Sequence, residues 1–136
     1  MASNIQTVPV SKGSFWAGWI MSGLPALFLL VGGVMDLVKP PSVVEGTLKM
    51  GYPESVIFGL GITILVCTIL YLIPRTAVLG AILLTGYLGG AVATHVRVGE
   101  GGKSIFAILF ALFLWGGLYL RDTRLRALVP LRSEAS

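Results

Sequence analysis

The amino-acid sequence predicts an all-α integral membrane protein, a four-helix bundle whose N- and C-termini lie on the same side. Two observations lead to this fold class. Of the 136 residues, 55% are hydrophobic and only 12% are charged, and the mean hydropathy of +0.89 lies far above that of soluble domains. The charges are also clustered, with long apolar stretches between the clusters, which is the pattern of a polytopic membrane protein.

The first two predicted spans cover about residues 16–38 and 56–73. The first contains Pro25, a local distortion of the kind that membrane helices tolerate. It is longer than the core of a typical signal peptide and no small-x-small cleavage site follows it, so we interpret it as a retained anchor. The second span ends where Pro74 and Arg75 follow it.

The third predicted span covers about residues 77–96 and the fourth 105–120, where Ser104 is placed to cap the helix. At about 1.5 Å per residue the second span is roughly 27 Å long and the fourth roughly 24 Å, against a hydrocarbon core of about 30 Å. Flanking residues must therefore join these helices, or the bilayer must thin. A soluble bundle is excluded because its outer faces would carry charges at every turn, and these segments carry none apart from Asp36 near the end of the first.

The longest connection, residues 39–55, is the only one with room for structure of its own. Its proline pair, followed by "SVVEGTLKMGYP", predicts a short amphipathic helix. The apolar residues expected to face lipid or the mouth of the bundle are Val43, Val44, Leu48 and Met50. Two interpretations remain open for this segment, a lid over the bundle and an ordinary connection.

The positive charges predict the orientation of the bundle. If the N-terminus is cytoplasmic, that side carries six of them, Lys12, Arg75, Arg121, Arg124, Arg126 and Arg132, and the other side carries four. The positive-inside rule therefore predicts that both termini are cytoplasmic. Basic residues beside a span meet anionic lipid head groups, so the lipid bilayer, and no nucleic acid, explains the net charge of +4. The aromatic residues expected in a belt at one interface are Trp16, Trp19, Tyr71, Trp115 and Tyr119.

The most promising site residues lie at the ends of the first and third spans, which must be on the same face of the membrane. Asp36 and His95, the only histidine, each lie within about one turn of these ends and therefore share a depth. A contact between them would lower the cost of placing either in the membrane. In the alternative, both reach the head-group layer and are solvated there. The other ionisable or phenolic candidates on this face are Arg97, Tyr52, Glu45 and Glu54.

The third span also carries a ridge of small residues, with Gly86 and Gly90 at its centre, that would let another helix approach closely. On a helical wheel His95 lies about 140 degrees from Gly90. We therefore expect the ridge to pack against a helix, while the His95 side, flanked by Thr85 and Tyr87, faces a cavity. Glycines are frequent throughout the chain, so the ridge leaves a homo-oligomer open without requiring one.

No motif for metal binding or catalysis is present in the sequence. One histidine and one cysteine, Cys67 within an apolar run, cannot form a metal site, and no HxxxH, CxxC or HExxH pattern occurs. The glycine-rich stretch 99–103 lacks the strand and helix of a phosphate-binding loop, and we interpret it as a turn. No cofactor is evident, and the sequence leaves open whether the protein is an enzyme.

The order and spacing of several short motifs resemble the DoxX-like family of small four-helix bacterial membrane proteins. These motifs are Asp36 with Lys39, "GYP" at 51–53, "IPR" at 73–75 and the glycine-rich run ending "ATHVRVG" at 93–99. The resemblance implies a multi-pass protein of the bacterial inner membrane. The family is named after a membrane subunit associated with thiosulfate oxidation and quinone reduction, and other relatives are linked to oxidative-stress complexes.

Three functions are compatible with these observations. The first is an accessory or structural membrane subunit of undetermined activity, which binds a membrane or oxidoreductase subunit. The second is a membrane-embedded site for a quinone or another small amphipathic ligand, in which His95 exchanges a proton, Asp36 orients it and Arg97 attracts a carbonyl or anionic group. The third, an exporter of a small hydrophobic molecule, is less favoured because four helices leave one monomer little room for alternating access.

Overall fold

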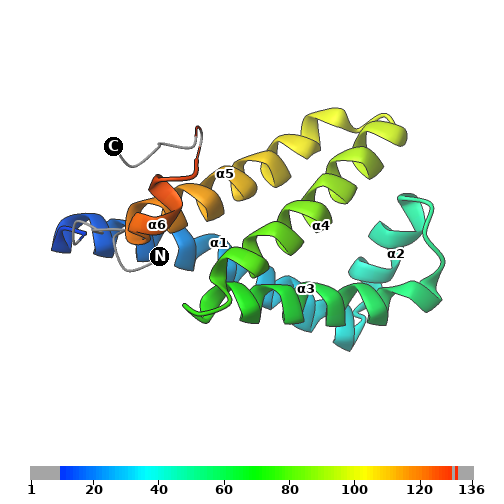
Figure 1. Cartoon of the computed structure of the whole chain (residues 1–136). Helices are drawn as coiled ribbons and strands as arrows, with labels where there is room; N and C mark the ends of the chain where they lie inside the picture. The colour runs from blue at the N-terminus through cyan, green and yellow to red at the C-terminus, as the bar shows by residue number, and fades with distance from the viewer. Residues whose placement is uncertain (1–9, 130, 132–136) are drawn as a thin grey trace.

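The computed structural model of the chain describes residues 10–129 and residue 131, and within them all regular structure is helical (Figure 1). The predicted all-α fold class is therefore confirmed. The elements in chain order are α1 Lys12–Val38, α2 Pro41–Lys49, the 3₁₀ turn η2 Glu54–Val56, α3 Ile57–Leu72, α4 Ala77–Arg97, the 3₁₀ turn η3 Gly101–Lys103, α5 Ser104–Arg121 and α6 Thr123–Arg126.

Four of these helices are long and apolar enough to cross a membrane. The two short predicted spans gain length from 3₁₀ turns, because η2 continues into α3 and η3 continues into α5. The continuous segments Glu54–Leu72 and Gly101–Arg121 have 19 and 21 residues, which brings both close to the thickness of the hydrocarbon core. The expected cap at Ser104 was wrong, because this residue already lies inside the helix and its hydroxyl donates to the Gly101 carbonyl at 2.5 Å.

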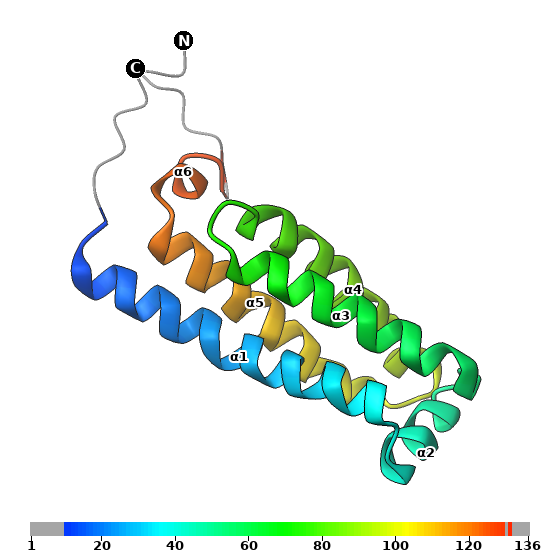
Figure 2. The same ribbon diagram turned by 90° about the horizontal axis from the view of Figure 1, so that it is seen from below.

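The four long helices form a bundle in which α1 and α4 each pack against both α3 and α5 (Figure 2). Small residues permit a close approach between α1 and α5. A Cβ atom added to Gly117 would lie 2.7 Å from the Gly18 carbonyl oxygen and closer still to the Ser22 hydroxyl. The side chain of Ser14 donates to the Leu120 carbonyl at 2.8 Å, so the first turn of α1 lies beside the last turn of α5.

Tyr71, near the C-terminal end of α3, is a buried polar link between three helices. Its side chain is 0% exposed, and its hydroxyl forms hydrogen bonds with Ser22 Oγ at 2.7 Å and with the Leu114 carbonyl at 2.5 Å. The prediction that Tyr71 belongs to an interfacial belt was therefore wrong. Trp16, in contrast, is 65% exposed and lies on the outside of α1.

The outer surface of the bundle is apolar along the helices. Leu24, Phe28 and Phe106 are each more than 60% exposed, which would be unfavourable in water and is favourable in lipid. The hydroxyl of the exposed Thr63 donates to the Gly59 carbonyl, four residues earlier, at 2.7 Å, and the buried Thr68 does the same with the Ile64 carbonyl. These polar groups are therefore satisfied within their own helix, as hydrocarbon surroundings require.

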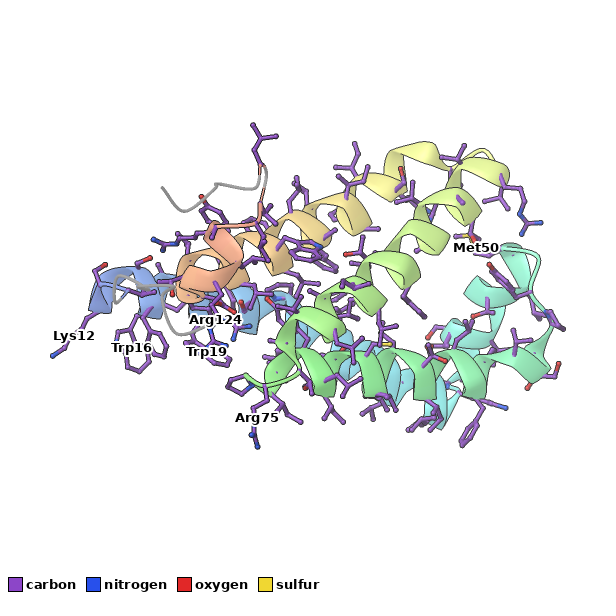
Figure 3. All side chains as sticks on the ribbon, in the orientation of Figure 1. Lys12, Trp16, Trp19, Met50, Arg75 and Arg124 are labelled. Atoms are coloured by element: carbon purple, nitrogen blue, oxygen red, sulfur yellow. The ribbon has the colours of Figure 1, made fainter. Side chains whose placement is uncertain are left out.

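The two ends of the bundle differ in shape and charge. Figure 1 shows α4 and α5 diverging from α1 and α3 toward one end, where α2 lies between the two pairs. Figure 3 shows Lys12, Arg75 and Arg124 at the opposite end, far from Met50 at the end of α2. We call these the α2 end and the α6 end.

Candidate functional site

A pocket of about 490 Å³ lies at the α2 end, and we call it the α2 pocket. Its volume falls within the range of about 300–1,000 Å³ that is typical of small-molecule sites. Residues of α1, α2, α3 and α4 line it, together with Tyr52 from the loop after α2. The helix α4 contributes the largest share, namely Gly86, Tyr87, Gly90, Ala91, Thr94 and His95.

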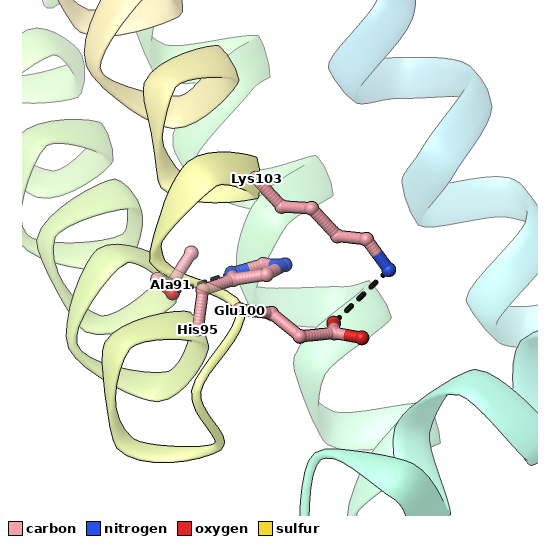
Figure 4. A network of polar contacts seen from close by, with 4 residues as sticks. All are labelled: Ala91, His95, Glu100 and Lys103. Atoms are coloured by element: carbon pink, nitrogen blue, oxygen red, sulfur yellow. Dashed lines mark hydrogen bonds and ion pairs between the residues drawn. The ribbon is translucent and has the colours of Figure 1, made fainter.

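His95 lies in the last turn of α4, half-buried at the wall of the pocket. Its Nδ1 atom is 2.7 Å from the Ala91 carbonyl oxygen. A carbonyl can only accept, so Nδ1 carries the hydrogen, and in the neutral ring Nε2 is left as an acceptor. Figure 4 shows the ring reaching out from α4 on the side where Glu100 and Lys103 form an ion pair at 3.0 Å.

Asp36 lies in the last turn of α1 and also lines the α2 pocket. Gly61 of α3 permits this position, since a Cβ atom there would be 2.8 Å from the Asp36 Cβ. The carboxylate forms no hydrogen bond or ion pair with any residue that the structure describes. It also lies at the negative end of the helix dipole, which disfavours a carboxylate. An acidic group in this position therefore has no stabilising partner within the described part of the fold.

A short chain of hydrogen bonds connects the loop after α2 to α4. The Thr94 hydroxyl donates to the Gly90 carbonyl at 2.8 Å, and the Tyr52 hydroxyl lies 2.8 Å from Thr94 Oγ1. Since the single hydrogen of Thr94 is directed at Gly90, Tyr52 is the donor to Thr94. Both side chains line the α2 pocket and hold the edge of the α2 segment against α4.

Arg97 is exposed and lies at the rim of the pocket. Its guanidinium donates to the Met50 carbonyl at the end of α2. Arg97 therefore holds the end of α2 against α4. Its side chain does not line the pocket.

The α2 pocket brings together four of the residues predicted from sequence, namely Asp36, Tyr52, Tyr87 and His95. No ion pair or hydrogen bond joins Asp36 to His95 among the described residues. The other acidic candidates, Glu45 and Glu54, are exposed and do not line the pocket.

Thr85, which was expected on the His95 side, lies in a different groove. Its hydroxyl accepts a hydrogen bond from Trp115 Nε1 at 2.7 Å, which links α4 to α5. This second groove has a volume of about 530 Å³ and an almost wholly apolar lining that includes Leu88, Gly89 and Val129. We call it the α4–α5 groove.

The expectation that the glycine ridge and His95 face different neighbours was also wrong. Gly86 and Gly90 line the same pocket as His95, and a Cβ atom added to either would meet no atom within 4 Å. The pocket extends over both the glycine ridge and the His95 side of α4, because α2 crosses the gap between the diverging helices. Within the described residues, no helix packs on this ridge.

Sequence reasoning missed several polar residues of the pocket wall, namely Ser42, Thr47 and Thr94. Helical spacing would have identified Thr94, which lies seven residues after Tyr87 and four after Gly90 on the same face. Among the apolar residues predicted for this segment, Val43 of α2 and Met50 just after it line the pocket, whereas Leu48 is 51% exposed on the outside.

Comparison with known proteins identifies the family. The model of the DoxX-like family matches residues 20–117, which include most of α1 and α5 and everything between them. No curated protein and no solved structure gives a significant match. The resemblance inferred from the short motifs is thereby confirmed. With its four apolar helices, the chain is a multi-pass membrane protein that belongs to the DoxX-like family.

Proposed function

We propose that the α2 pocket binds a small amphipathic molecule, with a quinone as the leading example. The observation that carries this proposal is the Asp36 carboxylate, which lines a pocket of about 490 Å³ and has no partner among the described residues. Ionisable groups in membrane helices are costly, and they usually serve a ligand, an ion or a proton path. A ligand at this position would supply the missing partner.

The residues of the pocket suit the two parts of such a molecule. Asp36, Tyr87 and His95 offer polar contacts for a head group, and Val43, Leu60 and the open glycines of α4 accommodate a flat ring or a tail. A bound quinone would supply reversible two-electron, two-proton chemistry. The contribution of the chain would be to orient the head group, and His95 Nε2 is placed to accept or return a proton.

Binding in lipid nanodiscs tests the proposal. A short-tailed benzoquinone and its hydroquinone, titrated anaerobically, are expected to bind saturably. Gly90→Leu fills the pocket and should weaken binding at least tenfold, because its side chain occupies the space of the ligand. Gly59→Leu is the matched control, since this exposed glycine of α3 also has nothing within 4 Å but lies outside the pocket. Absence of saturable binding, or equal losses in both variants, would contradict the proposal.

The second candidate function is an accessory or structural membrane subunit. It is favoured by the α4–α5 groove, where Gly89 leaves room for a partner helix and the lining is apolar. The partner would be a membrane or oxidoreductase subunit, or a second copy of the chain. Gly89→Leu should then abolish cross-linking to the partner in native membranes and leave ligand binding in the α2 pocket unchanged. Undiminished cross-linking in this variant would rule out the groove as the interface.

We also propose that the protein resides in the bacterial inner membrane with both termini in the cytoplasm. The proposal is supported by the excess of cationic residues at the α6 end, from which α1 starts and at which α5 finishes.

A further inference from the structure

We infer that the α2 pocket is a hydrogen-bond acceptor site, which selects amphipathic molecules whose head group donates hydrogen bonds. Hydroxyl and amino head groups meet this requirement, so the reduced form of a quinone should bind more tightly than the oxidised form, whose carbonyls only accept, and more tightly than an ether of the same shape. The inference rests on the proposed binding of a small amphipathic molecule and specifies its chemical class.

On α4 and the loop after α2, the polar hydrogens are directed away from a ligand. His95 Nδ1 donates to the Ala91 carbonyl at 2.7 Å, and the Thr94 hydroxyl donates to the Gly90 carbonyl at 2.8 Å. The Tyr52 hydroxyl then donates to Thr94 Oγ1 at 2.8 Å. When the imidazole is neutral, what remains for a ligand is a set of lone pairs, namely Nε2 and the oxygens of the two hydroxyls.

The other walls of the pocket repeat this pattern. On α2 the Thr47 hydroxyl donates to the Val43 carbonyl at 2.9 Å, and on α1 the Asp36 carboxylate, when ionised, can only accept. Two hydroxyls in the lining, those of Ser42 and Tyr87, have no hydrogen-bond partner among the described residues and can either donate or accept. Acceptors therefore predominate in the lining when Asp36 is ionised and His95 is neutral.

A ligand must complement this set to bind well. A hydroxyl group can donate to Asp36 or His95 while it accepts from Tyr87. An ether or carbonyl oxygen in the same place cannot donate a hydrogen bond. The acceptors of the pocket would then lose their contact with water and gain no hydrogen bond from the ligand, which weakens binding. Sites built around hydrogen bonds reject analogues that lack the matching group far more strongly than they discriminate by size.

Matched probes test the inference with the wild-type protein in nanodiscs, under anaerobic conditions. The first pair is a short-tailed hydroquinone and its dimethyl ether, which keeps the ring and the oxygens but has no donor. We expect the hydroquinone to bind at least tenfold more tightly. Equal affinities would overturn the inference and leave the proposed function intact. If the inference and the proposed function both fail, no probe will bind saturably.

A second pair of probes separates donation from charge. A short alkyl primary ammonium and its trimethylammonium analogue carry the same charge, but only the first can donate. Tighter binding of the primary ammonium supports a donor-selective site, and equal binding of the two would overturn it.

Asp36→Asn tests the contribution of the carboxylate, because the asparagine amide adds a donor at the same position. The ratio of hydroquinone to dimethyl ether affinity should fall severalfold in this variant. Glu45→Gln removes an exposed carboxylate of α2 that does not line the pocket, and it should leave the ratio unchanged. An unchanged ratio in Asp36→Asn would overturn the role given to Asp36. The two probe pairs use the wild-type protein, so they test the inference even if a variant fails to fold.

Discussion

At the scale of single residues, Tyr71 shows how one polar side chain can hold three membrane helices together. Its ring lies in α3, and its hydroxyl reaches Ser22 of α1 and the backbone of Leu114 in α5. Because Tyr71, Ser22 and Leu114 are all buried, each of these groups depends on the others for a hydrogen bond. The small side chain of Ser22 also permits the close approach of α1 to Gly117 of α5.

Removing the hydroxyl of Tyr71 should therefore destabilise the bundle. Tyr71→Phe is expected to cost about 1–2 kcal/mol of unfolding free energy, because Ser22 loses a buried partner and the Leu114 carbonyl loses a donor. The measurement is reversible unfolding in mixed detergent micelles. Tyr119→Phe is the matched control, since Tyr119 is 36% exposed and its ring still lies beneath Arg126 after the change. If both variants lose a similar unfolding free energy, the buried hydrogen bonds of Tyr71 do not stabilise the bundle more than an exposed hydroxyl does.

At the scale of secondary-structure elements, α2 is held mainly through its ends. None of its residues is buried. It begins just after Lys39, whose backbone adopts the left-handed conformation with φ of 56°, and it is followed by Gly51 with φ of 87°. These turns fold the segment back over the pocket, and the bond from Arg97 to the Met50 carbonyl fastens its far end.

Loss of the Arg97 side chain should loosen α2 without unfolding the bundle. In Arg97→Ala we expect the backbone amides of residues 42–50 to exchange hydrogen about three- to tenfold faster, since a single partly solvated bond is removed. Hydrogen exchange followed by mass spectrometry measures this directly. Arg75→Ala removes an exposed arginine at the α6 end and should leave exchange in α2 unaltered. Unchanged exchange in Arg97→Ala would mean that α2 is fixed by other contacts.

The same element shows what could be predicted from the sequence. Hydropathy and the position of prolines sufficed to predict the four apolar helices and the short helix after the proline pair. The order of the helices predicted that Asp36 and His95 lie at the same depth in the membrane, and both residues line the α2 pocket.

The rotation of each helix about its axis could not be predicted in the same way. A soluble helix shows its buried face by the contrast with polar residues, but a membrane helix is apolar on every side. For this reason Tyr71 was assigned to the surface, Thr85 to the site, and the ridge around Gly86 to a helix contact. Only packing against neighbouring helices decides these orientations.

At the scale of the whole molecule, the two ends of the bundle carry very different charge. Within the described residues, the α6 end has five cationic side chains and one carboxylate, whereas the α2 end has four of each. Arg132, which the sequence adds to the first group, lies outside the described residues. The α6 end is therefore suited to the cytoplasmic leaflet with its anionic lipids, and the α2 pocket would then open toward the opposite side.

Cysteine accessibility in intact cells tests this orientation. In a Cys67→Ala background, which removes the native buried thiol, Ser55→Cys should react with a membrane-impermeant maleimide added outside. Leu128→Cys should react only after permeabilisation. Both positions are exposed and uncharged, so neither change alters the charge balance that sets the topology. The reverse labelling pattern would place the α6 end outside, and it would mean that the α2 pocket exchanges its ligand with the cytoplasmic side of the membrane.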